Sequence, residues 1–136
     1  MNAWIKALLN NLDDQLEENQ RIAIMEACGE NCPFTHLSDE RLLDIKRNAK
    51  DELEFIEHLS RQWHVQIEGE EIYVVFDTCY CPLVNGDIRE ASRTLCYCTL
   101  GNIKKKFRLG LGRDVDVSME KTILGGDKEC RFKVLV

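Results

Sequence analysis

The cysteines set the narrowest limits on the fold and chemistry of this chain. The 136-residue sequence holds seven cysteines, and six of them occur in closely spaced pairs. The pairs are Cys28 and Cys32, Cys79 and Cys81, and Cys96 and Cys98, while Cys130 stands alone. An odd number of cysteines, with no export signal in the first residues, argues against a disulfide framework. Clustered thiols then predict metal binding or thiol chemistry in a reducing, cytoplasmic compartment.

Composition is typical of an ordinary globular protein. Apolar residues make up 44% of the sequence and charged residues 31%, which suits a chain with one hydrophobic core. We therefore expect a single domain over residues 1–136. The net charge of −6 argues against a nucleic-acid partner. No apolar run approaches the roughly 20 residues of a membrane span. Nothing in the sequence specifies an oligomer.

Hydrophobic periodicity predicts helices in the first half of the chain. Apolar residues recur at steps of three and four over residues 4–27, with a break or kink near residues 10–14. Gly29 is expected to end this segment in the left-handed conformation that glycine adopts after a helix. A further helix is predicted from Asp39 to about Trp63, with Ser38 as its N-cap.

Alternation of apolar and polar residues predicts strands in the second half. The predicted strands cover residues 65–68, 72–79, 115–119 and 130–136. A helix is expected from about Thr99 to Gly110 or Gly112, and residues 94–98 are ambiguous between strand and loop. This order predicts an α+β fold. An antiparallel sheet of four to five strands packs against helices, and the N-terminal helices precede the sheet.

The two CxC pairs predict a metal site. Alternate residues of an extended chain point the same way, so each pair would present two sulfurs on one side. Four thiolates suit a zinc ion, the first choice of cofactor, or an iron–sulfur cluster, the alternative. The candidate metal ligands are Cys28, Cys32, Cys79, Cys81, Cys96 and Cys98. Six candidates exceed one four-ligand site, so either a second site exists or one pair contributes a single ligand. Buried packing and redox chemistry stay open as alternatives.

Other residues give less specific signals. Cys130 lies on the apolar face of the last predicted strand and is interpreted as a packing residue. His36, His58 and His64 are interpreted as structural or solvated, with His36 the nearest of them to a cysteine pair. The basic run at residues 104–108 is interpreted as a solvated helix face, with an anion site as the alternative.

Four segments stand out together, namely CG at 28–29, CYCP at 79–82, SRTLCYCTLG at 92–101 and VDVSMEKTILGGDKECRF at 115–132. They resemble a family of small, cysteine-rich bacterial and archaeal proteins of unknown function. That family is similar to 4-vinyl reductase type domains and to L-2-amino-thiazoline-4-carboxylic acid hydrolase-like proteins. The resemblance implies an antiparallel α+β fold, a pocket for a small hydrophobic ligand, and metal binding through the paired cysteines. Asn102 departs from the pattern, which has an aromatic residue after the glycine.

These observations favour a non-enzymatic function. A cysteine-bound metal would organise a pocket for a small ligand, or the same thiols would sense redox or metal state. A metal- or thiol-dependent hydrolase is the alternative from another class, with Asp77 and Asp87 as the best-placed carboxylates. An iron–sulfur redox protein is the third hypothesis. The sequence assigns no catalytic residue, and it leaves open whether the chain is an enzyme.

Overall fold

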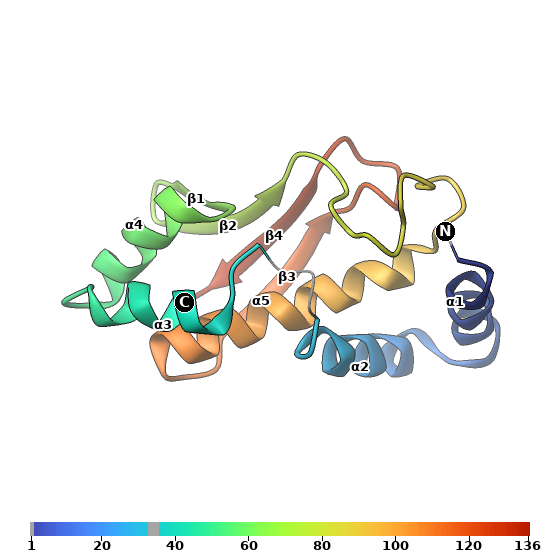
Figure 1. Cartoon of the computed structure of the whole chain (residues 1–136), viewed down its shortest axis with the longest axis horizontal. Coiled ribbons are helices and arrows are strands. Elements are labelled where there is room, and N and C mark those ends of the chain that lie inside the picture. The colour runs from blue at the N-terminus through green and yellow to red at the C-terminus, as the bar shows by residue number, and fades with distance from the viewer. Residues whose placement is uncertain (1, 33–35) are drawn as a thin grey trace.

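The computed structural model describes residues 2–32 and 36–136, which form five α-helices and four strands (Figure 1). The helices are α1 (Ala3–Gln15), α2 (Glu18–Gly29), α3 (Asp39–Arg47), α4 (Glu52–Gln62) and α5 (Cys96–Leu111). The strands are β1 (Val65–Glu68), β2 (Glu71–Phe76), β3 (Asp116–Lys121) and β4 (Cys130–Leu135). A short 3-10 helix, η1 (Arg93–Leu95), leads directly into α5. Within the described ranges, no helix combines the length and the apolar character needed to cross a lipid bilayer.

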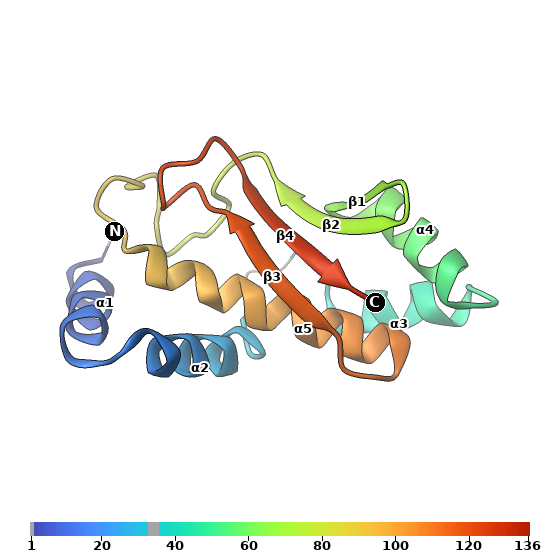
Figure 2. The ribbon, with the colours of Figure 1, turned by 180° about the vertical axis from the view of Figure 1, so that it is seen from behind.

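The four strands form one antiparallel sheet in the order β1-β2-β4-β3, which confirms the predicted α+β fold. In the central pair, Val74 of β2 lies opposite Phe132 of β4, and Ile72 lies opposite Val134. All four side chains are buried. Figure 2 shows β3 and β4 in front of α5, with no helix drawn over the opposite face of these strands. The long helix α5 therefore lies on the side of the sheet where the core forms.

The predicted helix boundaries are correct at the strongest cap and wrong where the chain changes direction. Ser38 begins α3 as predicted, because its hydroxyl accepts a hydrogen bond from the Arg41 backbone N–H at 3.2 Å. The single helix predicted up to Trp63 is instead two helices. Asp51 begins the second one by accepting from the Glu54 backbone N–H at 2.9 Å. The break between α1 and α2 lies at residues 16–17 rather than near residues 10–14.

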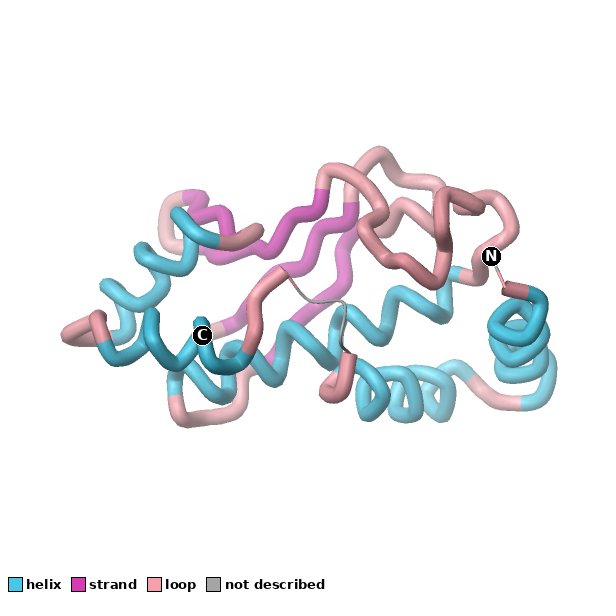
Figure 3. The backbone as a smooth tube through the Cα atoms, viewed as in Figure 1, coloured by secondary structure: helices cyan, strands magenta, loops and turns pink. Residues whose placement is uncertain are grey.

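Helices α2 and α5 cross so closely that glycine is required on both sides. A Cβ atom added to Gly29 would lie 1.9 Å from the carbonyl oxygen of Cys98. A Cβ atom added to Gly101 would lie 2.1 Å from the carbonyl oxygen of Glu26. Gly29 is thus the last residue of α2, selected for close packing, and not the left-handed residue that the sequence predicts. Figure 3 shows the two helices side by side, so the end of α2 lies against the first turns of α5.

The basic run in α5 pairs with acidic residues at the end of α2 and the start of α3, so it is only in part the solvated face that the sequence predicts. Lys106 is only 2% exposed, and its Nζ atom lies 2.8 Å from Oδ1 of Asp39. Lys104 and Arg108 pair with carboxylates at the end of α2, each at 2.9 Å. The positive charges therefore hold α2 and α3 against α5. The sequence pattern missed this because α5 has neighbours on several sides and presents little free surface.

Removing the charge of Asp39 is expected to destabilise the fold. The Asp39→Asn variant should lose about 1 kcal/mol of unfolding free energy at neutral pH. The buried Lys106 ammonium loses the carboxylate it contacts, but the Asp39 side chain is 45% exposed, so solvent screens part of the interaction. The hydrogen bond from Lys106 lowers the pKa of Asp39 below its ordinary value of 3.8. The extra unfolding free energy of the wild type over the Asp39→Asn variant is therefore complete above pH 3.8, and it shrinks as the pH falls below this value. Urea unfolding at neutral and acidic pH measures both effects, and a pH-independent difference would contradict this role.

Candidate functional site

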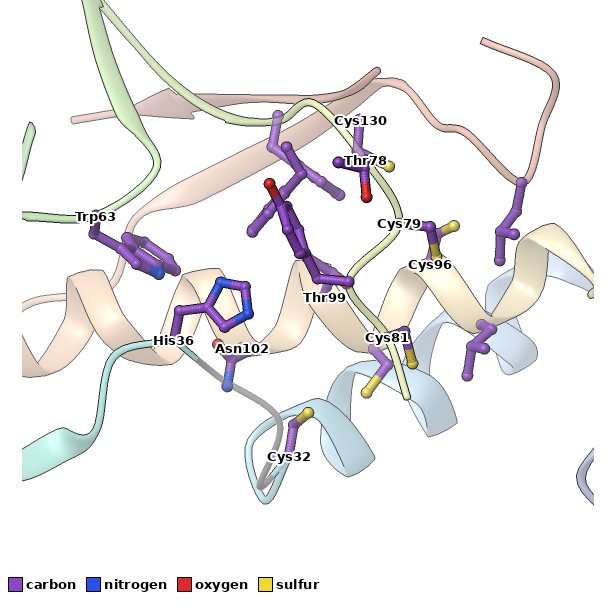
Figure 4. A pocket seen from close by; sticks show the side chains of 16 residues that line it. Cys32, His36, Trp63, Thr78, Cys79, Cys81, Cys96, Thr99, Asn102 and Cys130 are labelled. Atoms are coloured by element: carbon purple, nitrogen blue, oxygen red, sulfur yellow. The ribbon is translucent and has the colours of Figure 1, made fainter. Parts of the chain in front are cut away.

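A pocket lies between the first turns of α5, the loop after β2 and the start of β4 (Figure 4). Its cavity volume is about 100 Å³. The cysteines that line it are Cys32, Cys79, Cys81, Cys96, Cys98 and Cys130. Cys28 is exposed near the end of α2, and all seven cysteines are free thiols. The fold thus gathers cysteines from four separate segments of the chain in one place.

Four of the cysteines come together on the side of the pocket nearest α2. The Cys98 thiol interacts electrostatically with Cys32, Cys81 and Cys28, and it shares a hydrogen bond with Cys32. Cys81 interacts with Cys32 as well. We call Cys28, Cys32, Cys81 and Cys98 the four-thiol cluster. Its members come from the end of α2, the loop after β2 and the first turn of α5, so the cluster joins three segments of the fold.

The remaining three cysteines form a second group nearer the sheet. Cys96 interacts with Cys130 and with Cys79, and Cys130 also interacts with Cys79, so every pair in the group is coupled. We call these residues the three-thiol cluster. Figure 4 shows Cys79 and Cys96 close together beside the first turn of α5 and Cys130 at the start of β4, while Cys32 and Cys81 lie toward α2. Cys79 and Cys81 also interact with each other, so the two clusters are neighbours.

The two clusters overturn the prediction that each CxC pair presents both sulfurs on one side. Cys96 and Cys98 lie in the first turn of α5, where positions two residues apart differ by about 200° around the helix axis. They therefore belong to different clusters. Cys79 and Cys81 lie in the loop after β2 and are divided in the same way. The site also includes Cys130, which the sequence pattern assigns to packing alone.

The backbone after Cys81 influences the protonation of this thiol in the four-thiol cluster. The amides of Leu83 and Val84 act to lower the pKa of Cys81, and the Val84 N–H donates to the Cys81 carbonyl oxygen at 3.1 Å. Groups that lower the pKa of a thiol stabilise the thiolate, which is the form that binds metal ions. Burial opposes them and raises the pKa of Cys81. The loop after Cys81 is therefore shaped to support negative charge on this sulfur once a cation compensates for the burial.

The turn after β3 lies against the three-thiol cluster. The Thr122 side chain and the Leu124 backbone both act to lower the pKa of Cys96, against the larger effect of burial. The backbone N–H of Ile123 donates to Sγ of Cys130 at 3.3 Å. The turn therefore contributes one backbone donor to the cluster, at the Cys130 sulfur atom.

Without a bound cation, the most buried thiols are protonated at neutral pH. Burial raises the pKa of Cys96 to about 12. Burial also raises the pKa of Cys98 to about 12, with further contributions from Cys32, Cys81 and Cys28. The dipole of α5, which favours thiolates at its N-terminus, is outweighed here. A redox sensor or nucleophile needs an accessible thiolate, so Cys96 and Cys98 do not fit that role in this state.

Aromatic and histidine rings form the other wall of the pocket. Trp63, Phe76 and Tyr80 line it together with His36. Nδ1 of His36 lies 2.8 Å from Nε2 of His64, and the His64 ring lies 4.5 Å from the Phe76 ring. Burial lowers the pKa of His64, which favours its neutral form. This wall offers the apolar surface that the predicted small ligand would need, and ligand binding itself stays a prediction.

The described residues show neither a formed metal centre nor a catalytic carboxylate in the pocket. Asp77 accepts a hydrogen bond from the Tyr80 hydroxyl, and neither Asp77 nor Asp87 is among the described residues that line the cavity. Over residues 2–32 and 36–136, no three His, Cys, Asp or Glu side chains stand at metal-binding geometry. The structure therefore brings the predicted ligands into two clusters, but their present geometry does not support a metal site.

Fold and pocket together define a small α+β protein with a pocket walled by thiols on one side and aromatic rings on the other. The chain belongs to DUF6144, a family of unknown function, which it matches over residues 1–136. No curated protein and no solved structure matched the chain. The predicted resemblance to an uncharacterised family is confirmed. A relationship to 4-vinyl reductase type domains or to the thiazoline hydrolase-like proteins is not shown.

Proposed function

We propose that the four-thiol cluster binds one metal ion, zinc in the first instance, and that this ion organises the pocket of a non-enzymatic binding or sensing domain. The observation that carries the proposal is the convergence of four cysteines from three separate segments. Four sulfur ligands in a tetrahedral arrangement are the usual shell of a structural zinc ion. Three of the four, Cys32, Cys81 and Cys98, line the pocket, and Cys28 is exposed beside them.

The donor set suits a soft or borderline cation. Thiolates favour zinc, copper(I) and iron–sulfur clusters, whereas magnesium and calcium take oxygen ligands. Each thiol must lose its proton to bind, and the cation supplies the charge compensation that the buried site lacks. The backbone amides of Leu83 and Val84 act to lower the pKa of Cys81 and would favour its thiolate form as a ligand. The sulfur atoms would have to close around the ion, since they are not at coordination distances in the described structure.

An ion in this cluster would also have a structural effect. The loop from residue 77 to residue 92, which forms one wall of the pocket, contains no helix or strand. A metal ion held by Cys81 of this loop, Cys98 of α5 and the two cysteines at the end of α2 would cross-link all three. In small metal-binding proteins, the free energy of metal binding stabilises the folded state in this way.

Elemental analysis of protein purified without oxygen, together with a visible spectrum, tests the proposal. We expect at least one zinc ion per chain and a colourless protein. The double variant Cys28→Ser, Cys32→Ser should lose one ion while its circular dichroism spectrum stays unchanged, because both residues lie at the surface end of α2. If the protein is brown and contains iron and inorganic sulfide, the bound group is an iron–sulfur cluster and not zinc. That result would favour a redox function. Metal-free protein that takes up no added zinc would contradict the proposal.

A further inference from the structure

We propose that the pocket binds a small, uncharged carbonyl compound whose oxygen atom accepts a hydrogen bond from the indole N–H of Trp63. This deepens the proposed function, because it rests on the pocket being a binding site and names the class of molecule that would occupy it. It does not depend on the metal ion, since no cysteine takes part in the bond. The observations that carry it are a buried donor without a partner, an uncharged lining and the size of the cavity.

The indole nitrogen of Trp63 is a buried donor with an unmet requirement. Its Nε1 atom is buried and has no hydrogen-bond partner among residues 2–32 and 36–136. Buried donors nearly always have an acceptor, because leaving one unpaired carries the full cost of its desolvation. Figure 4 shows this nitrogen atom on the side of the Trp63 ring that faces His36 and the interior of the pocket. An acceptor atom of a bound molecule would therefore complete the wall.

The position of the indole ring is fixed by its neighbours. Trp63 lies directly after α4, where its backbone N–H donates to the Leu59 carbonyl oxygen at 2.9 Å. Its ring meets the Phe76 ring edge to face, with the centroids 6.4 Å apart. The next residue, His64, packs on Phe76 and contacts His36 through their ring nitrogen atoms. The N–H group is thus held in one direction, as a specific contact with a ligand requires.

The lining of the cavity selects for an uncharged ligand. Among the described residues that line it, none is Asp, Glu, Lys or Arg. A charged group that entered would lose its hydration and find no opposite charge there. The thiols on the other wall add only weak donors while they are protonated. The pocket therefore offers one strong donor to an acceptor atom, and aromatic rings to the hydrocarbon part of the same molecule.

The volume of the cavity limits the ligand to a few atoms. The cavity measures about 100 Å³. An apolar cavity of roughly 150 Å³ holds benzene, so a molecule of about five non-hydrogen atoms is the size that fits here. A ketone or aldehyde of this size combines an apolar body with one strong acceptor. Butanone is the probe of this class. In its apolar match, 2-methylbut-1-ene, a methylene group replaces the carbonyl oxygen.

Nuclear magnetic resonance of the full chain labelled with ¹⁵N tests the proposal. The sequence contains two tryptophans, and Trp4 is 68% exposed, so its indole N–H signal is an internal control. We expect butanone to shift the Trp63 indole signal downfield in a saturable manner and to leave the Trp4 signal in place. The alkene should bind without that downfield shift. An unshifted Trp63 signal at the highest soluble concentration of butanone would overturn the proposal.

The Trp63→Phe variant separates the hydrogen bond from apolar packing, because it keeps an aromatic ring and lacks the donor. Its affinity for butanone should fall about tenfold, while its affinity for the alkene should change little. Equal losses for both probes would contradict the assigned bond. Trp4→Phe is the matched control and should leave both affinities unchanged. Circular dichroism verifies folding, and the wild-type indole signal decides alone should Trp63→Phe unfold.

Zinc analysis of the same samples distinguishes this proposal from the four-thiol ion. Zinc-loaded protein whose Trp63 signal does not respond to butanone would overturn the ligand class and leave the metal proposal standing. Protein that takes up no zinc but binds butanone through Trp63 would contradict the metal proposal and support the ligand class.

Discussion

Replacing Cys81 and Cys98 together by serine is expected to abolish binding of one metal ion and to destabilise the metal-loaded protein strongly. Cys98 interacts with every other member of the four-thiol cluster, and the backbone amides of Leu83 and Val84 act to lower the pKa of Cys81. The free energy of unfolding with zinc bound should fall by about 5 kcal/mol or more, since structural zinc ions contribute on the order of 10 kcal/mol. Urea unfolding with stoichiometric zinc measures this loss.

The same comparison in the presence of a chelator is the control. Serine is close to cysteine in size but more polar, so burying two hydroxyl groups without metal should cost only about 1–3 kcal/mol. Most of the difference between wild type and variant should therefore disappear when zinc is removed. A loss of equal size with and without chelator would assign the two cysteines to packing and not to metal binding.

Gly101→Ala is expected to destabilise the fold by about 3 kcal/mol or more, because the added methyl group overlaps a backbone carbonyl across the α2–α5 contact. The nearest atom, the carbonyl oxygen of Glu26, would lie 2.1 Å from the new carbon atom. Backbone atoms cannot move aside as a flexible side chain can, so the two helices would have to separate. That separation would also move the cysteines at the end of α2 away from Cys98 and weaken metal uptake. Urea unfolding and a zinc titration measure the two effects.

The sign of this effect distinguishes close packing from helix propensity. At an open helix position, glycine to alanine stabilises by up to about 1 kcal/mol. Ala27→Gly, on the exposed side of α2, is the matched control and should cost about 1 kcal/mol through propensity alone. A Gly101→Ala variant as stable as the wild type, beside a destabilised Ala27→Gly variant, would show that the helices are not in close contact at this point.

The strands and the strongest helix start were predictable because their signals are local. The alternation around Val65 and Val74 fixes which side chains face the core, and Gly69 takes the positive φ of 63° that their connecting turn requires. Ser38 caps its helix through an oxygen atom three residues away from its partner. Each of these interactions forms between residues close in sequence, so the sequence pattern alone indicates them.

The arrangement of the cysteines was not predictable in the same way. The hydrophobic pattern of residues 94–98 has no clear period. The start of the helical segment depends on Ser92, which begins η1. Its hydroxyl accepts a hydrogen bond from the Thr94 backbone N–H at 3.2 Å. With the helix starting at Cys96, two cysteines expected on one side diverge. The inclusion of Cys130 depends on contacts between segments far apart in the chain, and no local signal reports such contacts. The alternation around Cys130 indicates only an inward-facing residue.

The fold divides the cysteines between two neighbouring thiol clusters. The loop after β2 contributes Cys79 to one cluster and Cys81 to the other, and the first turn of α5 contributes Cys96 and Cys98 in the same manner. Under the proposed function, an ion held by the four-thiol cluster would therefore stiffen segments that also carry Cys79 and Cys96. These two residues line the same pocket.

X-ray absorption at the zinc edge tests the central claim most directly. The sample is the Cys130→Ser variant loaded with one equivalent of zinc, so that the four-thiol cluster is the site observed. The four-thiol account predicts a first shell of four sulfur atoms at about 2.3 Å and no nitrogen or oxygen ligand. A first shell dominated by nitrogen or oxygen atoms at about 2.0–2.1 Å would contradict it.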